Sequence, residues 1–234
     1  MGKTLVLFSG GLDSTVLLNN AVKEDKPENV VALNIFYGQK HHKEMEYAKW
    51  TCEKLGVKKL DCDLSAVFDF NPQVSSLLMK SGEEIAHKSY SEQLSELRKE
   101  DENATVNTYV PYRNGLFLSY ATAVAIQLGC SVIEYGAHAD DSAGRAYPDC
   151  TPEFIDAQKE AIWEGSGFKV MMNAPLWAMN KSDVVALGLS LGMTHDDFRH
   201  TWSCYEGKDE PCKVCGTCID RKRAFMDNGI FDID

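Results

Sequence analysis

A short polar stretch near the start of the chain, Ser-Gly-Gly-Leu-Asp-Ser at residues 9–14, holds the residue types best suited to chemistry. Adjacent glycines let the backbone approach an oxyanion closely, and the free N–H groups of a helix that begins there would point at the anion. The hydroxyl groups of Ser9, Ser14 and Thr15 add donors, while Asp13 could hold a metal ion or cap the helix. The alternative is an ordinary strand-turn-helix with a Ser/Asp cap. The stretch predicts an anion-binding site.

The complete Ser-Gly-Gly-x-Asp-Ser string resembles the pyrophosphate loop of the ATP-pyrophosphatases, which activate a carbonyl or carboxyl oxygen as an adenylate. No lysine follows the second glycine, as one does in a Gly-x-x-x-x-Gly-Lys-Ser/Thr loop. Together with the resemblance, this favours chemistry at the α-phosphate of ATP. The resemblance implies catalytic roles for Ser9, Asp13 and Ser14. The ATP-binding residues that it implies are Phe8, Ser9, Gly10, Gly11, Leu12, Asp13, Ser14, Thr15, Val16, Leu17 and Leu18.

Alternating strand and helix patterns must position this loop. Apolar runs predict strands at 4–8, 30–37, 57–64, 131–135 and 170–174. Apolar residues at helical spacing, bounded by start and stop residues, predict one helix that begins at Leu12. The same signals predict further helices at 40–55, 115–128, 153–164 and 184–191. Strand-helix-strand units of this spacing form right-handed crossovers and parallel sheets. We therefore expect an α/β fold with a Rossmann-like parallel sheet.

Polar residues beside two of these elements suit an anionic ligand. Arg113 stands directly before the apolar helix and is either placed to meet an anion or is a surface arginine, and Asn114 is expected to cap that helix. Asp140 and Asp141 follow the strand at 131–135, and ligands bind beyond the carboxyl ends of such strands. These two acids suit a substrate or magnesium role better than turn formation. Three histidines are expected to be structural, without chemistry: His138, His195 and His200.

The composition is that of one globular domain of 234 residues, 44% of them hydrophobic. The 35 acidic against 24 basic residues give a net charge of −11, which repels phosphate backbones, so we expect no nucleic-acid partner. No run has the length of a membrane-spanning helix and no signal-peptide pattern precedes the first strand, which predicts a cytoplasmic protein without a membrane partner. Residues 65–108 are polar and irregular, either a solvated connector or a lid over the nucleotide.

Four of the eight cysteines cluster near the end of the chain, at Cys204, Cys212, Cys215 and Cys218. Four thiolates in a compact loop match tetrahedral Zn²⁺, while an iron–sulfur cluster or free thiols are the alternatives. Because cysteine would fill all four positions, we expect a structural zinc that holds residues 221–225 against the main domain. This divides the chain into a nucleotide-binding α/β domain at 1–200 and a zinc-binding segment at 201–234, packed on the same domain.

Over nearly its whole length the chain resembles the 7-cyano-7-deazaguanine synthases of the queuosine pathway, which belong to the pyrophosphate-loop enzymes of the adenine nucleotide alpha hydrolase-like fold. Five blocks carry the resemblance, in order: Phe-Ser-Gly-Gly-Leu-Asp-Ser-Thr at 8–15, Tyr-Gly-Gln-Lys-His at 37–41, Val-Pro-Tyr-Arg-Asn at 110–114, Tyr-Pro-Asp-Cys-Thr-Pro-Glu-Phe at 147–154, and Thr-Trp-Ser-Cys at 201–204 with the three later cysteines. Two features depart from it. Lys40 stands where arginine is common, and the stretch at 136–145 is longer than in many members.

The resemblance implies a reaction in two stages. ATP, with Mg²⁺, adenylates the carboxylate of 7-carboxy-7-deazaguanine, and ammonia displaces AMP to give an amide. A second ATP activates the amide oxygen, whose loss leaves the nitrile. The resemblance also suggests a homodimer, and a catalytic or substrate-side role for Arg113. The other substrate-side residues expected are Asp140, Tyr147 and Asp149.

Three other functions are compatible with parts of the sequence. The same fold could stop at 7-amido-7-deazaguanine, which only the mass of the product distinguishes. A tRNA-thiolating or lysidine-type enzyme shares the loop, but it requires a basic RNA-binding surface that the net charge of −11 opposes. A non-catalytic zinc module would leave the glycine loop without a purpose.

Overall fold

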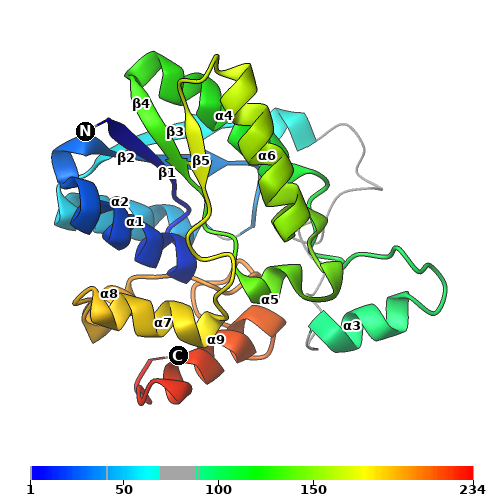
Figure 1. Ribbon diagram of the computed structural model, residues 1–234. Coiled ribbons are helices and arrows are strands. Elements are labelled where there is room, and N and C mark those ends of the chain that lie inside the picture. The colour runs from blue at the N-terminus through cyan, green and yellow to red at the C-terminus, as the bar shows by residue number, and fades with distance from the viewer. Residues whose placement is uncertain (1, 41, 69–87, 89, 234) are drawn as a thin grey trace.

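A five-stranded parallel sheet forms the centre of the computed structural model, which describes residues 2–40, 42–68, 88 and 90–233. The strands lie in the order β3-β2-β1-β4-β5 (Figure 1). Their bounds are Lys3–Leu7 for β1, Val30–Phe36 for β2, Lys58–Asp63 for β3, Cys130–Glu134 for β4 and Met171–Asn173 for β5. All four pairings are parallel. The predicted fold class is therefore confirmed, and the chain order reverses between β1 and β4, where such sheets bind ligands.

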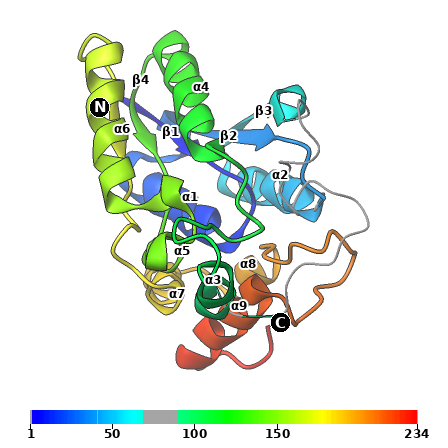
Figure 2. The ribbon, with the colours of Figure 1, turned by 90° about the vertical axis from the view of Figure 1, so that its right-hand side faces the viewer.

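Helices cover both faces of the sheet. On one face lie α1 (Leu12–Asp25) and α2 (Lys43–Leu55), and on the other α4 (Arg113–Leu128) and α6 (Pro152–Gly165) (Figures 1 and 2). Each face has its own apolar core, because β1 and β2 are buried on both sides and send alternate residues to each. The short helices and helical turns are α3 (Tyr90–Leu97), α5 (Ala139–Ser142), and turns at Pro27–Asn29, Ser65–Phe68, Ala143–Arg145 and Pro148–Cys150.

A third group of helices lies beyond the carboxyl ends of the strands. It consists of α7 (Lys181–Ser190), α8 (His195–Arg199) and α9 (Gly216–Asp227), at the bottom of Figure 1. The chain between α8 and α9 returns to the glycine loop, where the backbone N–H of Trp202 donates to the carbonyl oxygen of Gly10 at 3.1 Å. The beginning and the end of the chain therefore meet at this edge of the sheet.

Side chains of the local sequence cap the starts of α6, α7 and α8. Thr151 caps α6 by accepting from Phe154 N–H, and Asn180 and Asp183 form a capping box at α7. The expectation that Asn114 caps α4 is wrong. Helix α4 already begins at Arg113, and the N–H of Asn114 donates to the buried carboxylate of Asp149 at 2.9 Å. An acceptor from a distant turn thus replaces the local cap.

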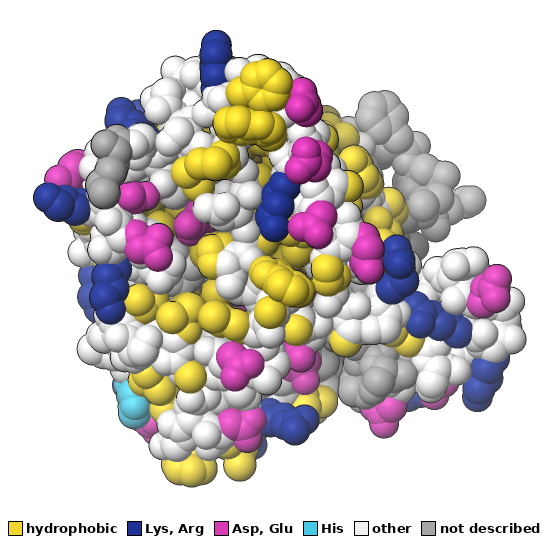
Figure 3. All heavy atoms as spheres, viewed as in Figure 1, with side chains coloured by type: hydrophobic (Ala, Val, Ile, Leu, Met, Phe, Trp, Pro, Cys, Tyr) yellow, Lys and Arg dark blue, Asp and Glu magenta, His cyan; other side chains and the backbone are white. Residues whose placement is uncertain are grey.

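The remaining surface features concern the predicted lid and one edge of the sheet. Of the lid predicted at 65–108, residues 69–87 and 89 lie outside the described residues. In its described part, Arg98, just after α3, donates to the carbonyl oxygen of Gly144 at 2.6 Å. At the β5 edge four large apolar side chains are exposed: Trp163, Phe168, Met171 and Trp177. Figure 3 shows hydrophobic side chains gathered on the face of the molecule that it presents. Among the described helices, none is long and apolar enough to cross a membrane.

Candidate active site

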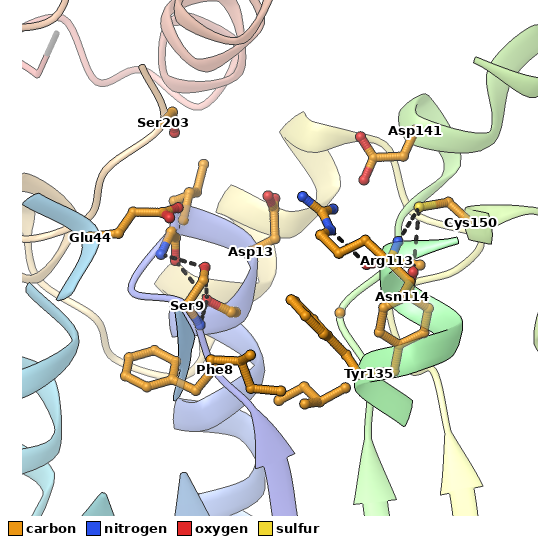
Figure 4. Close-up of a pocket in the computed structure, with 18 of the residues that line it drawn as sticks. Phe8, Ser9, Asp13, Glu44, Arg113, Asn114, Tyr135, Asp141, Cys150 and Ser203 are labelled. Atoms are coloured by element: carbon orange, nitrogen blue, oxygen red, sulfur yellow. Dashed lines mark hydrogen bonds between the residues drawn. The ribbon is translucent and has the colours of Figure 1, made fainter. Parts of the chain in front are cut away.

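Hydrogen bonds of its own serines fix the conformation of the glycine loop between β1 and α1. The Oγ of Ser9 accepts from Gly11 N–H at 3.0 Å and lies 3.1 Å from Ser14 Oγ (Figure 4). Gly10 has a φ of +94°, and a Cβ at that position would overlap the backbone oxygen of Glu44. Only glycine permits this turn. The loop therefore presents hydroxyl groups and the start of α1 to the same space, as an anion site requires.

That space is a cavity of about 210 Å³ at the switch point between β1 and β4. The glycine loop contributes one part of its lining, and five aromatic side chains contribute another. The loop side consists of Phe8, Ser9, Gly11, Leu12, Asp13 and Ser14. The aromatic side chains are those of Tyr37, Phe117, Tyr135, Trp202 and Tyr205, and Trp202 borders the loop itself, since its N–H donates to Gly10. The arrangement offers a place for phosphates beside a place for a flat ring system.

Lys181 faces the loop side of the cavity from the first turn of α7. Its Nζ donates to Asp13 Oδ2 at 2.7 Å. Burial by itself lowers the pKa of Lys181, but the carboxylates of Asp13 and Asp141 outweigh burial and raise that pKa above its ordinary value. For Asp13, burial instead raises the pKa, but the nearby Lys181 and His138 outweigh burial, so the pKa of Asp13 lies below its ordinary value. A protonated ammonium paired with the Asp13 carboxylate therefore lies on the loop side of the cavity. The sequence alone assigns no role in the site to Lys181.

Arg113 faces the cavity from the first residue of α4. Its Nη1 donates to the hydroxyl of Tyr37 at 3.1 Å and its Nε to Asn114 Oδ1 at 3.2 Å, and its guanidinium lies 5.1 Å from the centre of the Tyr37 ring. Among the described residues no carboxylate lies within ion-pair distance of Arg113, although Asp149 acts on it from farther away. Burial lowers the pKa of Arg113, and Tyr37 and Asp149 raise it further than burial lowers it. The guanidinium is charged and has only neutral hydrogen-bond partners, so it can receive an anion.

The other predicted residues divide into two groups. Gly10, Thr15, Val16, Leu17 and Leu18 support the loop without lining the cavity. The predicted substrate-side residues Asp140, Tyr147 and Asp149 also lie outside the lining. Asp140 accepts from the backbone N–H of Lys181 at 2.8 Å, and the Tyr147 hydroxyl lies 2.6 Å from Thr108 Oγ1. Lining residues that sequence reasoning did not assign to the site include Glu44, Cys150, Lys181, Trp202, Ser203 and Thr217.

The four clustered cysteines come together beside the cavity. Their Sγ atoms lie within 4.8 Å of one another, and three of the four side chains are buried. A compact set of four thiols fits tetrahedral zinc, which would have no open position and would therefore act as a structural ion. The cluster is linked to the site, because Cys215 Sγ lies 3.3 Å from the hydroxyl of Thr217, a cavity residue. Arg221 of α9 donates to Thr201 Oγ1 and to the carbonyl oxygen of Phe198, so α9 is anchored to the preceding segment.

Comparison with known proteins agrees with this geometry. The family model described as "Queuosine biosynthesis protein QueC" matches residues 3–229. This chain belongs to the QueC family. A 7-cyano-7-deazaguanine synthase of Archaeoglobus fulgidus is 38% identical over 98% of this chain and 88% of its own length. One of Caldicellulosiruptor saccharolyticus is 38% identical over 98% of this chain and 93% of its own length. The resemblance stated from the sequence is therefore confirmed for the QueC family.

Solved structures support the fold of this QueC family member. NMN synthetase from Francisella tularensis superposes with a TM-score of 0.51 at 17% identity, covering 97% of this chain and 77% of the other. At this identity the likeness concerns the fold alone. It agrees with the expected nucleotide-hydrolase-like α/β architecture.

Proposed function

We propose that this chain converts 7-carboxy-7-deazaguanine and ammonia into 7-cyano-7-deazaguanine at the expense of two ATP molecules. Membership of the QueC family supports the reaction class. The observation that carries the proposal is one cavity in which the serine-glycine loop and Lys181 face the Arg113 guanidinium, beside aromatic side chains. Arg113 has no carboxylate within ion-pair distance in the part of the chain that the structure describes. The loop and Lys181 suit the phosphates of ATP, and Arg113 with the aromatic side chains suits an aromatic carboxylate.

The first stage makes a carboxylate electrophilic. A carboxylate resists attack by ammonia, and its oxide is a poor leaving group, so an oxygen of the substrate attacks the α-phosphorus and pyrophosphate departs. The hydroxyls of Ser9 and Ser14, the N–H groups at the start of α1 and the Lys181 ammonium stabilise the charge that develops on pyrophosphate. Arg113 holds the substrate carboxylate during the approach.

The second half of each stage requires a dry site, and that of the first stage also requires ammonia. Ammonia attacks the carbonyl carbon, a C–N bond forms, the C–O bond to AMP breaks, and one nitrogen proton is lost. In the second stage the amide oxygen attacks the α-phosphorus of another ATP, and loss of AMP and the remaining N–H protons gives the nitrile. Trp202 and Tyr205, from the segment before α9, line the cavity and would limit the entry of competing water.

Two ions were expected from the sequence. Zinc fits the four cysteines, and its role would be structural. For Mg²⁺, the described residues contain no second group of three or more metal-ligating side chains beyond the cysteines. We propose that Mg²⁺ enters bound to the ATP phosphates, whose charge it neutralises.

The proposal is tested by incubating the protein with ATP, Mg²⁺, ammonium and 7-carboxy-7-deazaguanine and measuring base and nucleotide products by mass spectrometry. We expect the nitrile, with two AMP per nitrile. Accumulation of the amide with one AMP would instead support an enzyme that stops at 7-amido-7-deazaguanine. Absence of AMP under these conditions would contradict the proposal.

The proposed assembly and location have their own tests. We propose a homodimer, which size-exclusion chromatography with light scattering checks, and a cytoplasmic enzyme, which cell fractionation checks. Small molecules are its proposed partners. Retention of the protein on immobilised tRNA at physiological salt would contradict the expectation that it binds no nucleic acid.

A further inference from the structure

His138 lies behind the cavity, in the turn between β4 and α5. Its side chain is 3% exposed, and it does not belong to the cavity lining. The residues on either side of the turn do line the cavity: Ala137 before it and Asp141 after it. Any influence of His138 on a bound nucleotide must therefore pass through its neighbours.

The imidazole makes its polar contacts with cavity carboxylates. Nε2 lies 3.3 Å from Asp141 Oδ2 and 3.7 Å from Asp13 Oδ2. Nδ1 is buried and has no hydrogen-bond partner in the described part of the chain. A histidine that supports only the fold commonly donates from one ring nitrogen to a backbone carbonyl. Here the ring instead directs its polar edge at two acids that line the site.

These two acids compete for one cation. Asp13 holds the Lys181 ammonium at 2.7 Å, and Asp141 is close enough to raise the pKa of Lys181. If Asp141 also turned to Lys181, two carboxylates would neutralise the charge that is meant for the triphosphate. The Nε2 edge of His138, 3.3 Å from Asp141 Oδ2, is placed to hold Asp141 in its present position.

We propose that His138 is a positioning residue that holds the Asp141 carboxylate away from Lys181 and so keeps the lysine available to ATP. The inference rests on the proposed function only in that the cavity binds ATP. It assigns a role to a histidine that the sequence marked as purely structural.

The test uses two amide variants of similar size. In His138→Gln the side-chain nitrogen takes approximately the place of Nε2, whereas in His138→Asn it takes approximately the place of Nδ1 and cannot reach Asp141. Isothermal titration with a non-hydrolysable ATP analogue measures affinity without any substrate base. We expect the Asn variant to bind the analogue at least tenfold more weakly than wild type, and the Gln variant to stay within threefold of wild type.

The same titration is repeated in an Asp141→Asn background, with thermal unfolding of every variant. Because the competing carboxylate is then absent, His138→Asn should weaken binding no further. Equal affinities of the Gln and Asn variants would overturn the proposal, as would an equal loss caused by His138→Asn with and without Asp141. A wild-type protein that binds the analogue but forms no nitrile would contradict the proposed function and leave this inference standing.

Discussion

The Lys181 ammonium lies 2.7 Å from the Asp13 carboxylate, although 168 positions separate the two residues in the chain. The contact joins the first turn of α1 to the first turn of α7. Since Asp13 belongs to the glycine loop, the lysine that this type of loop lacks in its own sequence is supplied by a distant helix. The site thus has the positive charge of a phosphate-binding loop without its usual sequence pattern.

Replacing Lys181 by methionine should lower kcat about 10²- to 10³-fold, the effect of removing one group that stabilises charge in the transition state. Methionine keeps the length of the side chain and removes its charge. Release of pyrophosphate measures the effect. Lys159→Met, on the exposed side of α6, is the matched control and should leave the rate unchanged. Wild-type turnover of Lys181→Met would remove the lysine from the mechanism.

Arg113→Gln should discriminate between the two acyl substrates. Loss of a charge-assisted hydrogen bond of about 1.5–3 kcal/mol predicts a KM for 7-carboxy-7-deazaguanine about 10- to 100-fold higher. The amide carries no carboxylate, so its KM should change much less when it is supplied directly. Steady-state kinetics with each substrate gives both values. An equal increase for acid and amide would show that Arg113 does not bind the carboxylate.

Cys215→Ser should lose metal and solubility, because the four sulfur atoms form one compact set. Elemental analysis of the purified protein should find about one zinc per chain in wild type and much less in the variant. Cys62→Ser, outside the cluster, is the control and should keep its zinc. Iron with visible absorbance in the wild-type protein would contradict the assignment of zinc.

Glu134 predicts a dependence of stability on pH. Burial, with Glu24 and Asp25 nearby, raises the pKa of Glu134 to about 7 from an ordinary value of 4.5. Between these two values the folded protein keeps a proton that the unfolded chain has lost, so this group's contribution to stability falls as pH rises from about 4.5 and is fully lost above about 7.

Glu134→Gln removes that titration. At pH 8 we expect the free energy of unfolding to rise by about 1–3 kcal/mol, and its decline between pH 4.5 and 7 to become smaller. Urea unfolding across this pH range measures both effects. Glu24→Gln, on α1, is the comparison variant and should change the pH dependence less. A Gln variant whose stability follows the wild-type curve would contradict a proton on Glu134.

The sequence predicts the sheet, the loop and the cysteine cluster because each depends on neighbours along the chain. Apolar runs mark strands, and two glycines mark a turn that needs a positive φ at Gly10. It does not predict that Asp149 caps α4, because that acceptor comes from a turn 35 positions away. Nor does it predict which way Asp140 and Asp141 point after β4. The backbone N–H of Lys181 binds one and His138 contacts the other, and only the folded chain brings these groups together.

The hydrogen bond from Trp202 to Gly10 has a consequence for how activity arises during synthesis. During synthesis the glycine loop emerges nearly two hundred residues before Trp202 and Ser203, which line the same cavity. Nascent chains, and proteolytic fragments that have lost the C-terminal part, would therefore carry the loop without the residues that border it, and adenylates would be protected from hydrolysis only after the segment with the cysteine cluster has been made.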